Sequence, residues 1–186
     1  KIIPLNDMKG YELLKATMFG FGYPNYGVAL LLKEEATGKI FLQRVKITGS
    51  NAKPRILEIF KDEVIGLPGI PTVSALPLNG PEYMFFAVDK NVYCLDLNNI
   101  TKPVTLYKSF DANVVAMNAE SETYSCAHMA VGLENGEFYI LMIYGAKNLS
   151  EEEKVIYPKH GAAYPAEERM GRIVDIKYKQ LDHWNY

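Results

Sequence analysis

The sequence predicts an all-β protein, and two observations support that class. The chain of 186 residues contains 13 Tyr and 8 Phe, and aromatic side chains suit the half-buried surface of a pleated sheet. Short apolar runs alternate with polar turns along most of the chain. Groups of four such runs recur at steps of roughly 50 residues, which is typical of β-propeller blades. We therefore expect a β-propeller-like chain of about three four-stranded antiparallel blades. A β-sandwich whose hairpins resemble one another is the alternative.

The first strand of the chain has no predicted partner before it. Residues Gly10–Ala16 alternate as a strand does, and we interpret them as the last strand of a preceding blade. Rings take roughly four to eight blades, so three blades and one extra strand do not close. Together with a chain that begins at Lys1 rather than Met, this predicts a missing upstream domain, or self-association that completes the propeller.

Three repeat units follow, and they form one domain or fragment over residues 1–186. The unit at about 28–76 has the predicted strands Val28–Leu32, Lys39–Val45, Ile56–Phe60 and Thr72–Leu76. The unit at about 83–118 has Tyr83–Val88, Val92–Leu97, Val104–Tyr107 and Val114–Met117. The unit at about 128–178 has Met129–Leu133, Phe138–Tyr144, Glu153–Tyr157 and Arg172–Tyr178. In this last unit, Asn135-Gly136 predicts a two-residue hairpin turn with positive φ angles.

Charge and hydropathy exclude two classes of partner. The net charge is −2 with scattered Lys and Arg, and nothing resembles the basic stripe that nucleic-acid phosphates require. The longest apolar run, Phe138–Tyr144, is far shorter than the ~20 residues of a membrane-spanning helix. Cys94 and Cys126 are expected to be buried free thiols, because cysteine packs as a small hydrophobe. A disulfide, which would suit an exported protein, is the alternative.

An aromatic loop is the main candidate for ligand binding. Residues 20–27 combine glycine and proline with Tyr23 and Tyr26, so the loop is no regular helix and its rings can present flat faces. Flat aromatic faces stack on sugar rings, and Tyr23 and Tyr26 are therefore the predicted contacts to a carbohydrate. The alternative is a turn whose aromatic rings cover the core.

The sequence contains no recognisable catalytic or metal-binding motif. It lacks a Walker loop, a dinucleotide fingerprint, H-E-x-x-H and G-x-S-x-G, and its three histidines are far apart. We predict no cofactor, no metal and no assigned catalytic residue. Asp96, Asp175 and Glu58 could still meet across a ring as an acid/base pair, which leaves an enzyme open.

A family resemblance rests on the strand patterns Gly10-Tyr11-Glu12-Leu13-Leu14 and Gly171–Lys179. These segments, with the repeat pattern, resemble the C-terminal propeller-like region of PKD-like family lipoproteins of Bacteroidetes, over most of the chain. The resemblance implies export to the cell surface or outer membrane, lipidation and PKD-like domains upstream, and a gene context beside SusC/SusD-type glycan uptake. The family has no established catalytic residues to carry over.

Two functional classes follow from these observations. The first is a non-catalytic binding or scaffold module at the cell surface that recognises glycan or a partner protein. The second is a propeller-type glycan hydrolase or lyase with an acidic cleft. Converging carboxylates with perturbed pKa values would favour the enzyme, whereas an exposed aromatic shelf would favour the binding module.

Overall fold

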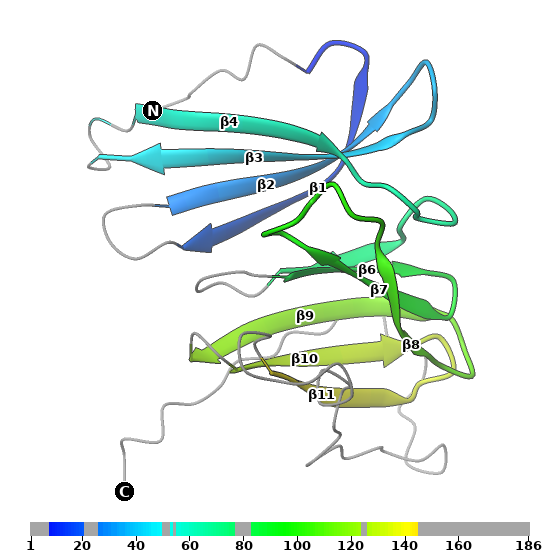
Figure 1. Cartoon of the computed structure of the whole chain (residues 1–186). Helices are drawn as coiled ribbons and strands as arrows, with labels where there is room; N and C mark the ends of the chain where they lie inside the picture. The colour runs from blue at the N-terminus through cyan, green and yellow to red at the C-terminus, as the bar shows by residue number, and fades with distance from the viewer. Residues whose placement is uncertain are drawn as a thin grey trace, which may run out of the picture.

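All regular secondary structure in the described part of the chain is β-strand. The computed structural model describes residues 8–20, 26–49, 53, 55–76, 83–123 and 126–144. These ranges contain β-strands and no helix (Figure 1). The strands are β1 (Tyr11–Gly20), β2 (Tyr26–Glu34), β3 (Ile40–Thr48), β4 (Arg55–Glu63), β5 (Val73–Ala75), β6 (Tyr83–Val88), β7 (Asn91–Asp96), β8 (Thr105–Ser109), β9 (Val114–Thr123), β10 (Cys126–Leu133) and β11 (Phe138–Tyr144). The predicted all-β class is confirmed.

The strands form three antiparallel sheets in chain order. Sheet A has the order β1-β2-β3-β4, sheet B the order β5-β6-β7-β8, and sheet C the order β11-β10-β9. Each strand pairs with its neighbour in sequence, so every sheet is a meander. Local pairing of this kind costs little loop-closure entropy.

Each sheet begins one strand earlier in the chain than the corresponding predicted unit. The segment interpreted as the last strand of a preceding blade is β1, which instead begins sheet A and pairs along its length with β2. The runs predicted to end the first two units, Thr72–Leu76 and Val114–Met117, instead begin sheets B and C as β5 and β9. The prediction failed because connection length does not reveal pairing: only residues 110–113 separate β8 from β9, yet the two lie in different sheets. The predicted strands Glu153–Tyr157 and Arg172–Tyr178 lie outside the described residues.

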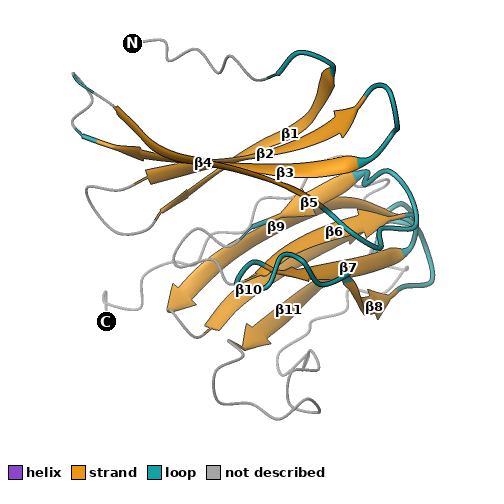
Figure 2. Cartoon of the chain, turned by 45° about the horizontal axis from the view of Figure 1, so that its top comes forward, coloured by secondary structure: helices purple, strands orange, loops and turns teal. Residues whose placement is uncertain are grey.

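Sheet B is the middle layer, with sheet A on one face and sheet C on the other (Figures 1 and 2). One core cluster joins Met84, Phe86 and Leu95 of sheet B to β2 and β3 of sheet A. The other joins Phe85 and Ala87 to β9, β10 and β11 of sheet C. Alternate side chains of a strand point to opposite faces, so both faces of β6 are buried. This explains why Tyr83–Val88 is continuously apolar rather than alternating.

The first strands of the three sheets lie next to one another. The Lys15 ammonium on β1 donates to the Ser74 carbonyl on β5 at 2.6 Å. The Thr72 hydroxyl, just before β5, donates to the Val114 carbonyl on β9 at 3.4 Å, and β5 and β9 are in contact. Successive meanders therefore stack with their first strands along a common side.

The hairpin at Asn135-Gly136 exists, but its turn is longer than predicted. β10 and β11 pair as expected, and Gly136 has φ 89°. Among the described residues Asp89 is the single non-glycine with positive φ, so Asn135 does not share the predicted geometry. Leu133 N–H donates to Glu137 O at 2.8 Å, and Gly136 N–H donates to Leu133 O at 3.1 Å. The loop therefore has the three residues 134–136, with glycine at the position of positive φ. The Asn135 side chain accepts the Glu137 N–H at 3.1 Å, which is common for asparagine in turns.

Candidate binding surface

The predicted aromatic contacts fall outside what the structure describes. Tyr23 lies in the undescribed segment 21–25, and Tyr26 is described only as the backbone residue that begins β2. Their role in carbohydrate binding stays a prediction. A different aromatic side chain is exposed in the described part of the chain, and it lies on β4.

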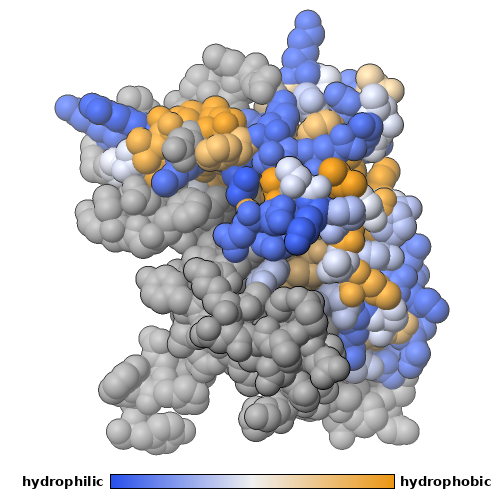
Figure 3. All heavy atoms as spheres, in the orientation of Figure 1, coloured by the Kyte–Doolittle hydropathy of each residue, from blue (hydrophilic) through white to orange (hydrophobic). Residues whose placement is uncertain are grey.

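Phe60 is the one exposed aromatic ring among the described side chains. Its relative exposure is 48%, and its neighbours on the same strand, Leu57 and Ile59, are exposed at 51% and 46%. We call these three side chains, with Arg44 and Asp62, the β4 rim. Apolar surface gathers over sheet A in the space-filling view (Figure 3). Phe60 is opposite Arg44 and Ile59 is opposite Val45, so Ile59 projects from the other face of the strand, and Arg44 and Asp62 lie on the Phe60 face. A large apolar ring that is exposed beside polar groups is typical of an interaction site.

Arg44 fixes the position of the Phe60 ring. The two residues are directly opposite in the β3–β4 ladder, and the guanidinium carbon lies 5.4 Å from the ring centroid. The Arg44 Nη2 donates to Asp62 Oδ2 at 3.2 Å, while Nη1 reaches the Leu97 carbonyl after β7 at 3.5 Å. The guanidinium is therefore held from both sheet A and sheet B. Cation–π contacts of this partly exposed kind contribute about 0.5–1 kcal/mol, and the Arg44–Asp62 pair adds about 0–1 kcal/mol.

The β4 rim combines groups of three kinds that can contact a ligand. The Phe60 ring offers an apolar face, Asp62 offers an acceptor, and Arg44 offers donors. Phe60 and Asp62 are two residues apart on β4, and Arg44 is opposite Phe60 on β3. Such a set can stack on the apolar face of a sugar ring or pack on an aromatic or aliphatic side chain. Sequence reasoning missed the rim because Phe60 reads as an ordinary strand residue until β4 is known to be an edge.

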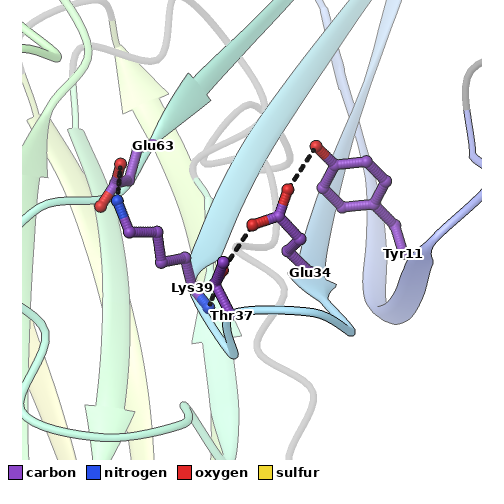
Figure 4. Close-up of polar contacts among 5 residues, drawn as sticks. All are labelled: Tyr11, Glu34, Thr37, Lys39 and Glu63. Carbon is purple, nitrogen blue, oxygen red and sulfur yellow. Dashed lines mark hydrogen bonds and ion pairs between the residues drawn. The ribbon is translucent and has the colours of Figure 1, made fainter.

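A second polar cluster holds the turn between β2 and β3 (Figure 4). Glu34 accepts from the Tyr11 hydroxyl at 3.3 Å and from Thr37. The Lys39 ammonium donates to Glu63 at 2.9 Å. The hydrogen bond to Glu63 and then its negative charge raise the pKa of Lys39. The two carboxylates thus have separate partners, and the cluster clamps the strand ends of sheet A.

The hypothesis that Asp96, Asp175 and Glu58 meet as an acid/base pair stays a prediction, because the structure describes the side chain of Asp96 alone among the three. Asp96 accepts the Asn98 N–H at 2.9 Å and so closes the turn after β7. The side chain of Glu58 and all of Asp175 lie outside the described residues. Among the described side chains no group of three or more His, Cys, Asp and Glu could hold a metal ion.

Cys94 and Tyr107 titrate abnormally because they lie in the layer between sheets B and C. Both pack against that core cluster, and the Tyr107 ring lies 4.9 Å from the Phe85 ring. Burial, and then the charge of Asp96, raise the pKa of Cys94 to about 12. Burial, and then Cys94, raise the pKa of Tyr107. Cys94 is a free thiol, as predicted, whereas the side chain of Cys126 is not described. A thiol with a raised pKa is a poor nucleophile at neutral pH.

Comparison with known proteins adds no relative to this picture. A scan of the chain against protein-family models gives no match, and a search of curated proteins gives none either. Within its described residues the chain has no helix long and apolar enough to cross a bilayer.

Proposed function

We propose that this chain is a non-catalytic binding or scaffold module that recognises its ligand on the β4 rim. The observation that carries the proposal is the exposed Phe60 ring, which is in contact with the Arg44 guanidinium. That guanidinium is itself fixed by hydrogen bonds to Asp62 and to the Leu97 carbonyl. The guanidinium holds the ring in place before any ligand arrives, and an aromatic ring fixed in this way loses little side-chain entropy on binding. The ligand is a glycan or a surface partner protein.

The scaffold that we propose is β-propeller-like. Support comes from the stack of consecutive antiparallel meanders and from the first strands β1, β5 and β9, which follow one another along one side. Propeller blades repeat in this way around an axis. Further blades would come from an upstream domain or from self-association.

We propose that the protein is exported and lies at the cell surface or outer membrane of a bacterium. The support is the resemblance of two strand segments and of the repeat pattern to PKD-like family lipoproteins. In that context a binding module beside a SusC/SusD-type system would capture glycan for uptake, and Tyr23 and Tyr26 would add to the aromatic surface.

A glycan array with the full-length protein tests the proposal. Phe60→Ala should weaken the binding of any captured glycan by about 1–3 kcal/mol, by analogy with stacking of nucleic-acid bases on aromatic side chains. The matched control is Leu106→Ala, because Leu106 is exposed at 59% on the edge strand β8 of another sheet. Equal binding by both variants and the parent protein would remove the β4 rim as the site. Turnover of a polysaccharide that a single carboxylate substitution abolishes would instead establish the hydrolase or lyase.

A further inference from the structure

The β4 rim holds two opposite charges beside the Phe60 ring, and their balance bears on the class of ligand. The Arg44 guanidinium carbon lies 5.4 Å from the ring centroid, so the ring has a cation against one side. Arg44 Nη2 and Asp62 Oδ2 are 3.2 Å apart, and both side chains are partly exposed. A ligand that stacks on the exposed ring therefore comes close to a donor group and to an acceptor group.

Without Asp62, the guanidinium would make this surface attract anions. A guanidinium has a permanent charge and five N–H donors, and it pairs readily with carboxylates. In the part of the chain that the structure describes, Asp62 is the carboxylate that pairs with Arg44. The other hydrogen bond of the guanidinium goes to a neutral group, the Leu97 carbonyl. The charge of Arg44 is therefore balanced by Asp62.

The neighbouring charges do not upset this balance. Two residues along the ladder from Arg44 and Phe60, Lys46 is directly opposite Glu58, and that pair adds no net formal charge. The surface around the Phe60 ring is thus close to neutral while Asp62 is present, and it gains one positive charge when the Asp62 carboxylate is removed.

Asp62 has opposite effects on neutral and on acidic sugars. Its oxygens have more lone pairs than the bond from Arg44 uses, and these accept hydrogen bonds from hydroxyl groups. A hydrogen bond to an ionised acceptor is roughly twice as strong as one between neutral groups, so a hydroxyl beside the ring is favoured. A sugar carboxylate in the same position would lie beside a like charge, which disfavours it.

We propose that Asp62 is a specificity-determining residue, which makes the β4 rim select neutral sugars over sugars that carry carboxylates. The inference rests on the proposed function and narrows the ligand to a neutral sugar, with its apolar face on Phe60 and its hydroxyls at Asp62 and Arg44. Specificity of this kind combines an attractive contact with the right ligand and a repulsive one with the wrong ligand.

Pairs of oligosaccharides that differ in their carboxylates alone test the inference. The probes are oligomers of galacturonate, mannuronate and glucuronate, each compared with the same oligomer after its carboxylates have been reduced to alcohols. Titration calorimetry measures their binding to the full-length protein at low and at physiological ionic strength. The parent protein should bind the neutral member of a pair about two- to fivefold more tightly than the acidic member.

Two variants with the same change in net charge separate the role of Asp62 from general electrostatics. Asp62→Asn keeps an acceptor oxygen but loses the negative charge, so it should bind the neutral oligomer about fivefold more weakly. It should bind the acidic oligomer about two- to fivefold more tightly, and this gain should shrink as salt is added. Glu63→Gln is the matched control. Glu63 also forms an ion pair on sheet A, with Lys39 at 2.9 Å, but it projects from the other face of β4 than Asp62 does.

The preference within each pair decides the outcome. Melting temperatures close to that of the parent protein show that both variants fold. An acidic oligomer that the parent protein binds more tightly, or an Asp62→Asn variant with the parent's preference, would overturn the inference. An equal shift in Glu63→Gln would also overturn it, because the effect would then follow net charge alone.

The same measurements separate this inference from the proposed function. Glycan binding that depends on Phe60 but shows no preference within a pair would overturn the inference and leave the proposed function in place. Binding of a protein partner through Phe60, with no neutral oligomer bound, would do the same. Loss of Phe60 without effect on any ligand would instead remove the β4 rim as the site.

Discussion

Substitution of two consecutive phenylalanines, Phe85 and Phe86, distinguishes a stack of three sheets from a sandwich of two sheets. Phe85 and Phe86 are both fully buried, at 0% exposure, but Phe85 belongs to the core between sheets B and C and Phe86 to the core between sheets A and B. In a sheet with one solvated face, neighbouring residues on a strand differ in burial. Here both Phe85→Ala and Phe86→Ala leave a cavity in a packed layer.

The expected cost is similar for the two variants. Removing a buried Phe side chain costs about 3–5 kcal/mol, and a domain of this size melts about 2–4 °C lower for each kcal/mol lost. Each variant should therefore melt about 6–20 °C below the parent protein. Phe60→Ala is the control, because its ring is 48% exposed and its loss costs about 1 kcal/mol or less.

Urea unfolding followed by circular dichroism measures these differences. With a slope of about 1–3 kcal/mol per M urea, Phe85→Ala and Phe86→Ala should both lower the midpoint by roughly 1–5 M, and Phe60→Ala by a fraction of that. If one of the two core variants unfolds like the parent protein, the face of β6 from which that ring projects is not buried and the middle-layer assignment is wrong.

Three other changes have expected signs. Gln43 is fully buried and neither side-chain amide atom has a partner in the described part of the chain, so Gln43→Met should raise the unfolding free energy by about 1–3 kcal/mol; a lower melting temperature would reveal a hidden partner. The pKa of Cys94 is raised from 9.0 to about 12, so the stability that its neutral thiol contributes is complete below pH 9 and is lost between pH 9 and 12. Cys94→Ala should lose less stability over that range, and an unchanged slope against pH would contradict the assignment. Gly136→Val should lower the free energy of unfolding by about 1 kcal/mol or more, because φ at Gly136 is 89°. Melting curves of the variant and the parent protein that superimpose would show that the turn adopts another backbone conformation without cost.

The strands could be predicted from the sequence, but the way they combine could not. Apolar runs with polar breaks predicted the strands at β2, β3, β4 and β5 through β11, because a half-buried pleat imposes those patterns. The pairing of β1 could not be read, since a strand at the start of a chain looks the same whether its partner precedes or follows it. The sheet to which β9 belongs could not be predicted either. A connection as short as Phe110–Asn113 can join two strands of one sheet or lead to the next sheet.

The candidate site depended even more on tertiary arrangement. The sequence predicted a binding loop at residues 20–27 because glycine, proline and tyrosine together are unusual in a strand. Phe60 does not stand out within Ile56–Phe60, and its exposure follows from β4 being an edge and from Arg44 lying opposite it. Sequence patterns indicate which side chains alternate, but they do not indicate which strand of a sheet is last.

Nuclear Overhauser contacts from the methionine methyl groups test the three-layer arrangement most directly. Met84 lies in the cluster with Leu31 and Leu42 of sheet A, and Met129 lies in the cluster with Phe85 and Ala87 of sheet B. In a methyl-labelled full-length protein, we expect contacts from the Met84 methyl to β2 and β3, and from the Met129 methyl to the side chains of β6. A Met84 methyl with contacts only inside sheet B would show that sheet A does not cover it and would contradict the stack.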